Sequence, residues 1–318
     1  MRAFVTGGTG FVGRRLVALL RARGDDVVAL VRSPARAAEL DAELVEGDLS
    51  SRQRLAEAMP GADAVFQLAA VYKIGIPPRE RAAMHAVNVD GTQNVLDAAR
   101  DAGVARTVYV STVNVFGNTR GNVVDETYER PGEDFVSEYD RTKWLAHRAT
   151  EERVARGDPI VIVQPGVIYG PGDHSELGGQ LERAARGKLL FVSFPTLGFN
   201  AAHVDDVAAG ILLAHDRGRT GESYVLGGEL TTMRDAVRAA AAAGGKRPPR
   251  VTMPTLLMRP LVPIGPLVGR LAGTAPNLGE LISASDGVTY WARDDKARRE
   301  LGYDPRPLAI GLADTFGR

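Results

Sequence analysis

The chain has no cysteine among its 318 residues. This absence excludes disulfide bonds, thiolate metal sites and cysteine nucleophiles, and it is compatible with the cytoplasm. Net charge is also absent, because 39 basic residues balance 39 acidic ones. We therefore expect a small-molecule partner and no nucleic acid.

A long uninterrupted apolar run is missing as well. The most apolar stretch, 253–273, is broken by prolines and arginines, whereas a membrane-spanning helix needs about 20 consecutive apolar residues. The first predicted strand begins at Arg2, which leaves no room for a signal peptide. We therefore expect no membrane span and a cytoplasmic protein.

The strongest local pattern is the segment 6–13, TGGTGFVG, between an apolar run and residues with helical spacing. It predicts a strand, a tight turn and a helix. Gly7 suits a turn that no side chain permits, Gly10 a close approach to a pyrophosphate, and Gly13 packing of the helix on the strand. The helix N-terminus favours phosphate, so we predict dinucleotide binding.

The second predicted strand, 27–31, ends where such folds choose between two nicotinamide cofactors. An acidic residue there accepts a hydrogen bond from the ribose 2′-hydroxyl, whereas an arginine pairs with a 2′-phosphate. Arg32 occupies the place, Arg36 follows, and no acidic residue occurs between 27 and 38. The sequence therefore predicts NADP(H).

Strands and helices alternate through the first half of the chain. This pattern predicts an α/β fold, a Rossmann-type doubly wound parallel sheet with a smaller, mostly C-terminal substrate-binding lobe. We assign 1–170, with a strand and helix around 200–228, to the NADP-binding Rossmann domain. The lobe takes 171–199 and 229–318.

Tyr139 and Lys143 open a predicted helix and lie one turn apart on the same face. A tyrosine has a pKa of about 10 in isolation, and a nearby ammonium lowers that pKa towards neutral, as a proton donor requires. The hydroxyls of Ser111 and Thr112 end a predicted strand, at the edge where ligands bind. Strand alternation points Ser111 the other way.

Asn88 lies inside the predicted helix 78–102, where asparagine is unfavourable. It either holds a water or a backbone carbonyl behind the active site, or is a tolerated polar residue at a kink. His203 and its acidic neighbours suggest a metal site, but no third ligand stands nearby, and Asp206 is expected to cap a helix. We predict no metal.

In order and spacing, these motifs resemble the extended short-chain dehydrogenase/reductase family of the NAD-dependent epimerase/dehydratase superfamily, over residues 2–214. The segment 296–305 resembles its dihydroflavonol-reductase-like branch. The residues that carry the family resemblance are Gly7-x-x-Gly10-x-x-Gly13, Asp48-Leu49, Ala69-Ala70, Asn88, Thr112, Tyr139-x-x-x-Lys143, Gln164 to Gly172 and His203 to Val207.

The resemblance implies that Tyr139 protonates a substrate carbonyl while hydride arrives, Lys143 binds the nicotinamide ribose, and Thr112 holds the carbonyl oxygen. It adds Asn88 to the catalytic set. The implied cofactor contacts are Gly7, Thr9, Gly10, Phe11, Val12, Gly13, Arg32, Arg36, Asp48, Leu49, Leu68, Ala69, Ala70, Tyr139, Lys143, Gln164, Pro165, Gly166 and Val167. The expected substrate contacts are Val71, Tyr72, Asn114, Phe194 and Phe199.

Two departures argue against sugar chemistry. The segment 198–202 lacks the arginine of sugar-nucleotide epimerases, and 112–114 lacks the Asp-Glu pair of sugar dehydratases. We predict NADPH-dependent reduction of a hydrophobic or aromatic ketone or aldehyde, reversible as alcohol oxidation. The alternatives are an NAD-dependent nucleotide-sugar epimerase and a non-catalytic NADP-binding regulator. The resemblance is compatible with a homodimer formed through the helices that carry Asn88 and Tyr139.

Overall fold

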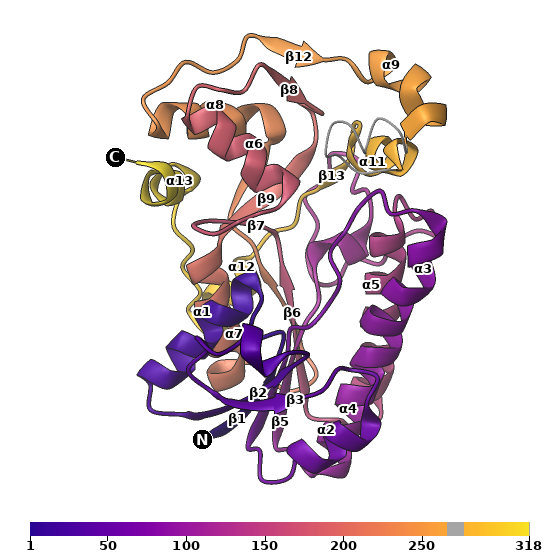
Figure 1. Cartoon of the computed structure of the whole chain (residues 1–318), viewed down its shortest axis with the longest axis vertical. Coiled ribbons are helices and arrows are strands. Elements are labelled where there is room, and N and C mark those ends of the chain that lie inside the picture. Colours follow the sequence, from indigo (N-terminus) through magenta and orange to yellow (C-terminus); the bar gives the residue numbers. More distant parts are fainter. Residues whose placement is uncertain (266–276, 318) are drawn as a thin grey trace.

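The computed structural model describes residues 1–265 and 277–317. A seven-stranded sheet forms its lower part in Figure 1, with the strand order β10-β6-β5-β4-β1-β2-β3. Every pairing in this sheet is parallel. The strands are β1 (Arg2–Thr6), β2 (Asp26–Val31), β3 (Glu43–Glu46), β4 (Ala64–Gln67), β5 (Arg106–Val110), β6 (Ile160–Pro165) and β10 (Ser223–Leu226).

Helices cover both faces of this sheet, so its central strands are buried along their whole length. On one face, α1 (Phe11–Ala22) and α7 (Val204–Arg217) share an apolar core with the strands. On the other lie α2 (Arg52–Ala58), α4 (Gly91–Asp101) and α5 (Glu138–Ala155). The strand order reverses direction between β1 and β4, where such folds open a crevice for ligands. The predicted fold class is confirmed.

The predicted helix 78–102 is continuous but not uniform. It consists of α3 (Pro78–His85), a π-helical turn (Ala86–Asp90) and α4. Asn88 lies within the π-helical turn, where the wider backbone spacing occurs.

The smaller lobe has a second sheet of the strands β11 (Glu229–Thr232), β9 (Gly198–His203), β13 (Thr289–Tyr290) and β7 (Val167–Tyr169). A parallel pair, β8 (Phe191–Ser193) and β12 (Val251–Met253), lies beside it. The helices α6 (Glu176–Ala185), α8 (Met233–Ala243) and α13 (Leu308–Phe316) pack on one another. The described residues also form the short helices α9 (Thr255–Met258), α11 (Leu278–Ser285) and α12 (Asp295–Leu301).

The chain passes between the Rossmann part and the smaller lobe at more places than the predicted domain boundaries contain. Within 200–228, α7 and β10 join the Rossmann part, but β9 pairs with β7 and β11 in the small sheet. The helix α12, predicted with the lobe, packs on α7 and β10 instead, because the buried Ala297 and Leu301 fill the Rossmann core.

The apolar stretch 253–273 is only partly within the described residues. Its described part continues from the last residue of β12 through α9 into a 3₁₀ turn, Arg259–Ile264. Residues 266–273, including two of the interrupting side chains, lie outside. No helix in 1–265 or 277–317 combines the length and the apolar character needed to cross a bilayer.

Candidate active site

The turn after β1 needs glycine at two positions. Gly7 has a φ of 71°, and a Cβ there would lie 2.8 Å from the Ala69 nitrogen. A Cβ on Gly13 would overlap the Gly7 carbonyl oxygen. These roles confirm the predicted turn and the close helix packing. No side chain caps α1 and no acidic residue lies in its first turn, so its N–H groups suit an anion. The approach of Gly10 to a pyrophosphate stays a prediction.

The buried Thr6 hydroxyl ties β1 to the loop after β4. It accepts hydrogen bonds from the amides of Leu68 and Ala69, both at 3.2 Å, and donates to the Gln67 side-chain carbonyl. Gln67 also donates to Thr92 at 3.3 Å. These bonds hold the backbone that leads to the exposed Ala70, at the edge where the cofactor is expected.

The arginines predicted to select the cofactor are exposed at the end of β2. Neither Arg32 nor Arg36 has an ion-pair partner within the described part of the chain. Hydrogen bonds from the Ser50 hydroxyl and amide, at 2.6 and 2.8 Å, lower the pKa of Asp48, and the Arg32 charge adds to this effect. Arg32 and Asp48 therefore lie near each other at the ends of β2 and β3.

Leu49 turns its side chain inward against Gly91, where a Cβ would lie only 2.7 Å from the Leu49 Cβ. Its carbonyl accepts a hydrogen bond from Asn94 at 2.8 Å. Any contact of Leu49 with a cofactor therefore falls to its backbone amide.

The start of α5 is held by a buried ion pair that the sequence did not reveal. Arg130 lies 2.6 Å from Asp140, and their side chains are 4% and 0% exposed. Ser137 caps the helix by accepting a hydrogen bond from the Asp140 amide at 3.1 Å. Ser137, at the end of the loop 117–137, and Asp140, which pairs with Arg130 of that loop, lie on either side of Tyr139 in the chain. The loop and the helix therefore position Tyr139 together.

Tyr139 and Lys143 are both buried, with 7% and 4% exposure. The Lys143 ammonium donates to the Val110 carbonyl at 2.9 Å and to the Tyr109 hydroxyl at 3.5 Å. These bonds fix Lys143 against the end of β5.

Burial decides the protonation of this pair. It raises the pKa of the Tyr139 phenol well above its ordinary value and lowers the pKa of Lys143 to about 7. The prediction that Lys143 brings the tyrosine pKa towards neutral is therefore wrong for the protein by itself. Both side chains are desolvated, so each favours its neutral form. A neutral phenol is the form that can donate a proton.

Thr112 is the hydroxyl directed at this tyrosine. A hydrogen bond with Thr112 opposes the rise in the pKa of Tyr139. The same hydroxyl donates to the Asn114 side-chain oxygen at 3.1 Å and accepts from the Asn114 amide at 3.2 Å. Ser111 points the other way, to His147 Nδ1 at 3.0 Å. The predicted orientation of the two hydroxyls is confirmed, and Asn114 is placed beside them.

Asn88 positions the loop after β4, and its place in the catalytic set stays a prediction. Its amide bonds both backbone groups of Val71, at 2.7 Å to the nitrogen and 3.1 Å to the oxygen. It also donates to Thr142 on α5 at 3.1 Å. Of the alternatives raised by the sequence, binding of a backbone carbonyl is correct. The loop after β4 is thereby fixed to α5.

Tyr72 stands in the crevice next to Val71. Its side chain packs against Tyr139, and 58% of the residue is exposed. Partial desolvation of its hydroxyl, with the charges of Asp173 and Glu176, raises the pKa of Tyr72 to about 12. Its predicted place at the substrate side is consistent with this position.

The two predicted phenylalanine contacts lie away from Tyr139. Phe199 is 1% exposed and belongs to the core of the small lobe, so its prediction as a substrate contact is wrong: β9 is covered by helices on that face. Phe194 is 5% exposed, has a φ of 48°, and packs on α11 with Ile74. It supports the loop that carries Tyr72 rather than facing open solvent.

The segment after β6 carries the remaining predicted cofactor contacts. Gln164 is 1% exposed, and its Oε1 has no hydrogen-bond partner in the described part of the chain. Pro165 ends β6, and Gly166 approaches Asn200 so closely that a Cβ would lie 2.7 Å from its carbonyl oxygen. Val167 then begins β7. A buried acceptor without a partner is a group that a ligand can satisfy.

His203, and not Asp206, caps α7: its Nδ1 accepts a hydrogen bond from the Asp205 amide at 3.3 Å. Asp206 instead pairs with Arg306 at 2.8 Å. The expected cap is therefore wrong, because a long-range partner engages the aspartate. Within 1–265 and 277–317, no three His, Asp or Glu side chains are grouped as a metal would require.

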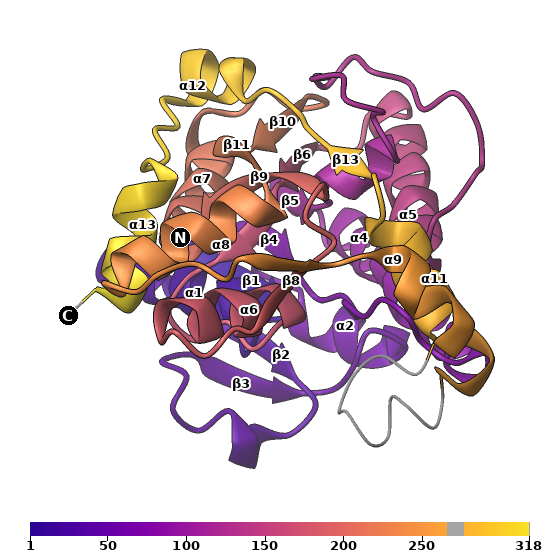
Figure 2. The same ribbon diagram turned by 90° about the horizontal axis from the view of Figure 1, so that it is seen from above.

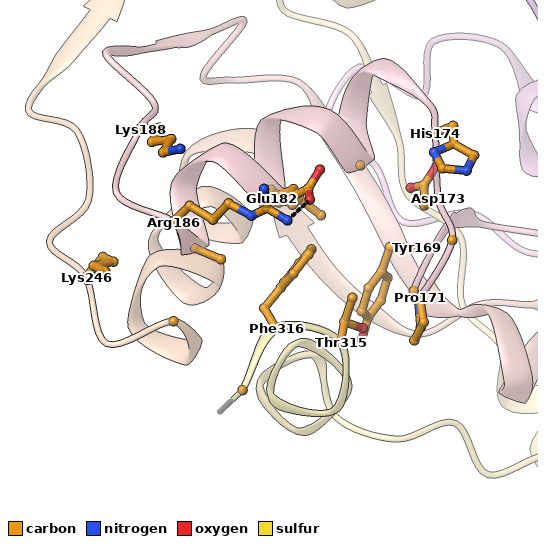
Figure 3. Close-up of a pocket in the computed structure, with 17 residues that line it drawn as sticks. Tyr169, Pro171, Asp173, His174, Glu182, Arg186, Lys188, Lys246, Thr315 and Phe316 are labelled. Atoms are coloured by element: carbon orange, nitrogen blue, oxygen red, sulfur yellow. Dashed lines mark ion pairs between the residues drawn. The ribbon is translucent and has the colours of Figure 1, made fainter.

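A cavity of about 700 Å³ lies in the small lobe, apart from these residues (Figure 3). Arg186, Lys188 and Lys246 line one end, and Asp173 and His174 line the other. None of the predicted catalytic side chains contributes to its wall. It is not the place of the predicted chemistry.

The family model described as "NAD dependent epimerase/dehydratase family" matches residues 3–227. Among curated relatives, a "Putative dihydroflavonol 4-reductase" from Synechocystis is 34% identical over 98% of this chain and 92% of its own. A "4-hydroxy-2-methyl-3-oxo-4-farnesyl-3,4-dihydroquinoline-1-oxide ketoreductase" from Stigmatella aurantiaca is 35% identical over 96% and 92%.

Solved structures of other proteins share this fold. The crystal structure of gox2253 is 33% identical, with a TM-score of 0.81 over 98% of this chain and 96% of its own. A DesIV double mutant, a dTDP-glucose 4,6-dehydratase from Streptomyces venezuelae with NAD bound, is 26% identical, with a TM-score of 0.78 over 99% and 96%.

The chain belongs to the NAD-dependent epimerase/dehydratase family, in agreement with the predicted resemblance to its extended reductase branch. It is therefore an enzyme of the oxidoreductase type whose cofactor is a nicotinamide nucleotide. The site fits such a group on three observations: a turn that admits no Cβ, a helix N-terminus without a side-chain cap, and exposed arginines after β2 that have no ion-pair partner among residues 1–265 and 277–317.

Sequence reasoning missed the Arg130–Asp140 pair, the negative charges opposite Tyr72, and the partners of His147. The only signal for the ion pair was Asp140 itself, a charged residue beside Tyr139 in the first turn of the helix. Its partner lies ten residues away in an irregular loop, so no periodic pattern marks it.

Proposed function

We propose that the protein reduces the carbonyl of a hydrophobic or aromatic ketone or aldehyde to an alcohol with NADPH, reversibly. The observation that carries the proposal is the buried Tyr139 in contact with the exposed Tyr72 ring, one helical turn from Lys143, which donates a hydrogen bond to the Val110 carbonyl at the carboxyl end of β5. Names of the relatives, a dihydroflavonol reductase and a ketoreductase, support the same class.

Each residue has a separate role. Tyr139 donates its proton to the carbonyl oxygen as negative charge develops there, and Thr112 stabilises that charge by hydrogen bonding. Lys143 holds the cofactor ribose. Bound NADPH provides the hydride. In alcohol oxidation, the Tyr139 phenolate accepts the proton.

Arg32 and Arg36 are the proposed partners of the 2′-phosphate. Both are exposed and free of ion pairs in the described residues, so no internal bond must break when a phosphate binds. Arginine suits this role because its planar guanidinium forms paired hydrogen bonds with phosphate.

Tyr72, Val71 and Asn114 are the proposed substrate contacts. Tyr72 offers an exposed aromatic face next to Tyr139, and an aromatic face favours an apolar or aromatic substrate. The negative charges of Asp173 and Glu176 act on the Tyr72 hydroxyl, which disfavours an anionic substrate.

The test is a substrate panel followed by absorbance at 340 nm. It contains benzaldehyde, acetophenone, an aliphatic β-keto ester, UDP-glucose and UDP-galactose, each with NADPH and with NADH. We expect reduction of at least one neutral carbonyl compound, faster with NADPH, and no reaction of the sugar nucleotides. Interconversion of the two UDP-sugars without net cofactor use would overturn the proposal.

That second outcome would favour the epimerase alternative, which the fold shared with a NAD-bound dTDP-glucose dehydratase supports. A tightly held cofactor distinguishes the two, because an epimerase must retain it between half-reactions. Extraction of the purified protein should then release NAD in near-stoichiometric amount. We expect instead an exchangeable cofactor that dialysis removes.

A further inference from the structure

Two chain segments lie side by side at the end of the smaller lobe. The strand β8 pairs in parallel with β12. A Cβ on Gly187 would lie 3.3 Å from the Lys246 side chain, so the stretches that lead into the two strands are also in contact. We call the segments 186–193 and 244–265 together the lobe tip. Figure 1 shows β12 and α9 at the upper end of the molecule, and Figure 2 shows them from above.

Exposed apolar side chains gather at the lobe tip. Six of the nine exposed large hydrophobic residues in the described part of the chain belong to it: Leu190, Val251, Leu256, Leu257, Leu261 and Val262. The four most exposed of the nine are among them, from Val251 at 61% to Leu190 at 81%. A concentration of exposed apolar side chains marks a place where a protein contacts another molecule or a membrane.

The lobe tip carries charge of one sign only. It has no acidic residue and six basic ones, which are Arg186, Lys188, Lys246, Arg247, Arg250 and Arg259. Arg186 pairs with Glu182, and Arg259 lies 3.9 Å from Asp286. The other four are exposed and have no ion-pair partner among the described residues. Because the whole chain has no net charge, this local excess favours a negatively charged partner.

Basic and apolar side chains follow one another along the same stretch of the lobe tip. Arg250 precedes Val251, and Arg259 lies between Leu257 and Leu261. The surface of an anionic bilayer accommodates both kinds of side chain. Leucines enter the boundary between headgroups and acyl chains, while the longer arginine and lysine side chains reach the phosphates. Clusters of about four to eight basic residues are typical of surfaces that bind anionic lipids.

Other negatively charged partners fit the lobe tip less well. The centre of a protein interface is depleted of charged residues, and a nucleic acid is bound mainly through its phosphates, which leaves Leu256 and Leu257 without a partner. The tip is also too short to cross a bilayer, because α9 has four residues and prolines interrupt the stretch 254–263. A membrane contact at this place therefore lies along the surface.

We propose that the lobe tip docks the protein on the surface of a membrane that contains anionic phospholipids. Leu256 and Leu257 enter the headgroup boundary, and the basic residues of the tip bind the lipid phosphates. This docking goes beyond the proposed function and does not depend on it, since none of the proposed catalytic side chains belongs to the tip.

Vesicle sedimentation with the purified full chain tests the docking. Vesicles of phosphatidylcholine alone are compared with vesicles of equal parts phosphatidylcholine and phosphatidylglycerol. We expect binding to the anionic vesicles, little binding to the neutral ones, and weaker binding at higher salt, because salt screens charges. Absence of binding to the anionic vesicles would overturn the proposal and leave the proposed function untouched.

Two double variants separate the apolar contribution from the charged one. Leu256→Ser with Leu257→Ser should weaken binding to the anionic vesicles at least about tenfold, because the buried apolar area is lost. Arg247→Gln with Arg250→Gln should weaken it about 25-fold, because each basic residue near an anionic surface contributes about fivefold. Weakening in the arginine variant alone would indicate a nucleic acid or an acidic protein as the partner. Weakening in the leucine variant alone would remove the need for anionic lipid, so either result contradicts the proposal.

Matched controls remove similar side chains elsewhere on the surface. Leu230→Ser with Ile310→Ser removes two exposed apolar side chains outside the tip. Arg54→Gln with Arg156→Gln removes two exposed arginines, on α2 and at the end of α5. Both controls should bind anionic vesicles like wild type, and urea unfolding checks that all four variants fold. Equal weakening by the tip variants and their controls would exclude the lobe tip as the docking surface.

The absence of cysteine permits a direct measurement of insertion. Leu256→Cys introduces one thiol, which is labelled with an environment-sensitive fluorophore, and Ile310→Cys is the control. With anionic vesicles we expect a blue shift of the emission, and quenching by lipids with brominated acyl chains, in the Leu256 variant only. Bound protein with unshifted emission in that variant would show that the tip does not enter the membrane.

Discussion

The Tyr72 ring meets the Tyr139 ring edge to face, with centroids 4.8 Å apart and planes at 86°. This contact joins the loop after β4 to the first turn of α5, and it covers the predicted proton donor from the crevice side. An exposed side chain thus helps to keep Tyr139 at 7% exposure.

Replacing this ring should change the acidity of the proton donor. Because burial is the main cause of the raised pKa of Tyr139, Tyr72→Ala should admit water and lower that pKa. The alkaline decline of kcat/KM for reduction should then begin at lower pH than in wild type. Tyr72→Phe, which keeps the ring, is the control. An unchanged pH profile in Tyr72→Ala would show that the contact does not set the pKa.

The Tyr139→Phe variant removes only the hydroxyl. Loss of a proton donor typically costs about 100-fold to 10,000-fold in rate, so we expect kcat to fall within that range while NADPH still binds. Binding is followed by quenching of protein fluorescence on titration with NADPH. Full activity of the variant would exclude Tyr139 as the donor.

The Arg32→Ala variant tests the choice of cofactor. A hydrogen bond to a charged group contributes about 1.5 to 3 kcal/mol, so the Kd for NADPH should rise about tenfold to a hundredfold, and the Kd for NADH should change little. Isothermal titration with each cofactor measures both. Arg238→Ala serves as a control, since Arg238 is an exposed arginine on α8 that pairs with Asp235. Tighter binding of NADH than NADPH by wild type contradicts the assignment.

Lys143 should make the free energy of unfolding depend on pH. Its pKa in the folded protein is about 7, below the ordinary value near 10.4, so the unfolded chain binds the extra proton between these values. Stability therefore rises with pH through this window, and the cost at pH 7 is on the order of a few kcal/mol.

The measurement for Lys143 is urea unfolding at pH 7 and pH 9.5, compared with Lys143→Met. The variant lacks the titrating group but keeps most of the side-chain volume. We expect wild type to gain stability relative to Lys143→Met as the pH rises. A constant difference between the two proteins would mean that Lys143 keeps an ordinary pKa.

The Arg130–Asp140 ion pair should be essential for stability near the site. Both side chains are buried, and removing one partner of a buried pair costs about 3 to 5 kcal/mol. Arg130→Met should therefore lower the free energy of unfolding by about this amount, because burial already raises the pKa of Asp140 and the uncompensated acid must protonate. The double variant with Asp140→Leu should recover part of the loss. Urea unfolding of wild type and of these two variants checks this.

Much of the site followed from local patterns. Gly7 and Gly13 were predictable because a turn with positive φ and a close helix contact exclude side chains. Tyr139 and Lys143 were predictable because helical spacing alone puts them on one face. The orientation of Ser111 and Thr112 followed from the alternation of a strand.

The remaining features depend on residues far apart in the chain. Asn88 was ambiguous because its partner, Val71, lies 17 residues away. The substrate role predicted for Phe199 failed because the cover over β9 comes from distant helices. The cap predicted for Asp206 failed because Arg306 lies 100 residues further on.

The sequence by itself determined the nucleotide turn, the fold class and the candidate proton donor, since each depends on backbone conformation or on spacing within one element. Only the tertiary structure decided the protonation of Tyr139 and Lys143 and the place of Asn88 between the loop after β4 and α5. Protonation depends on the exclusion of water, and the place of Asn88 depends on the packing of α5 against the segment that contains Val71. Neither is a property of a single segment.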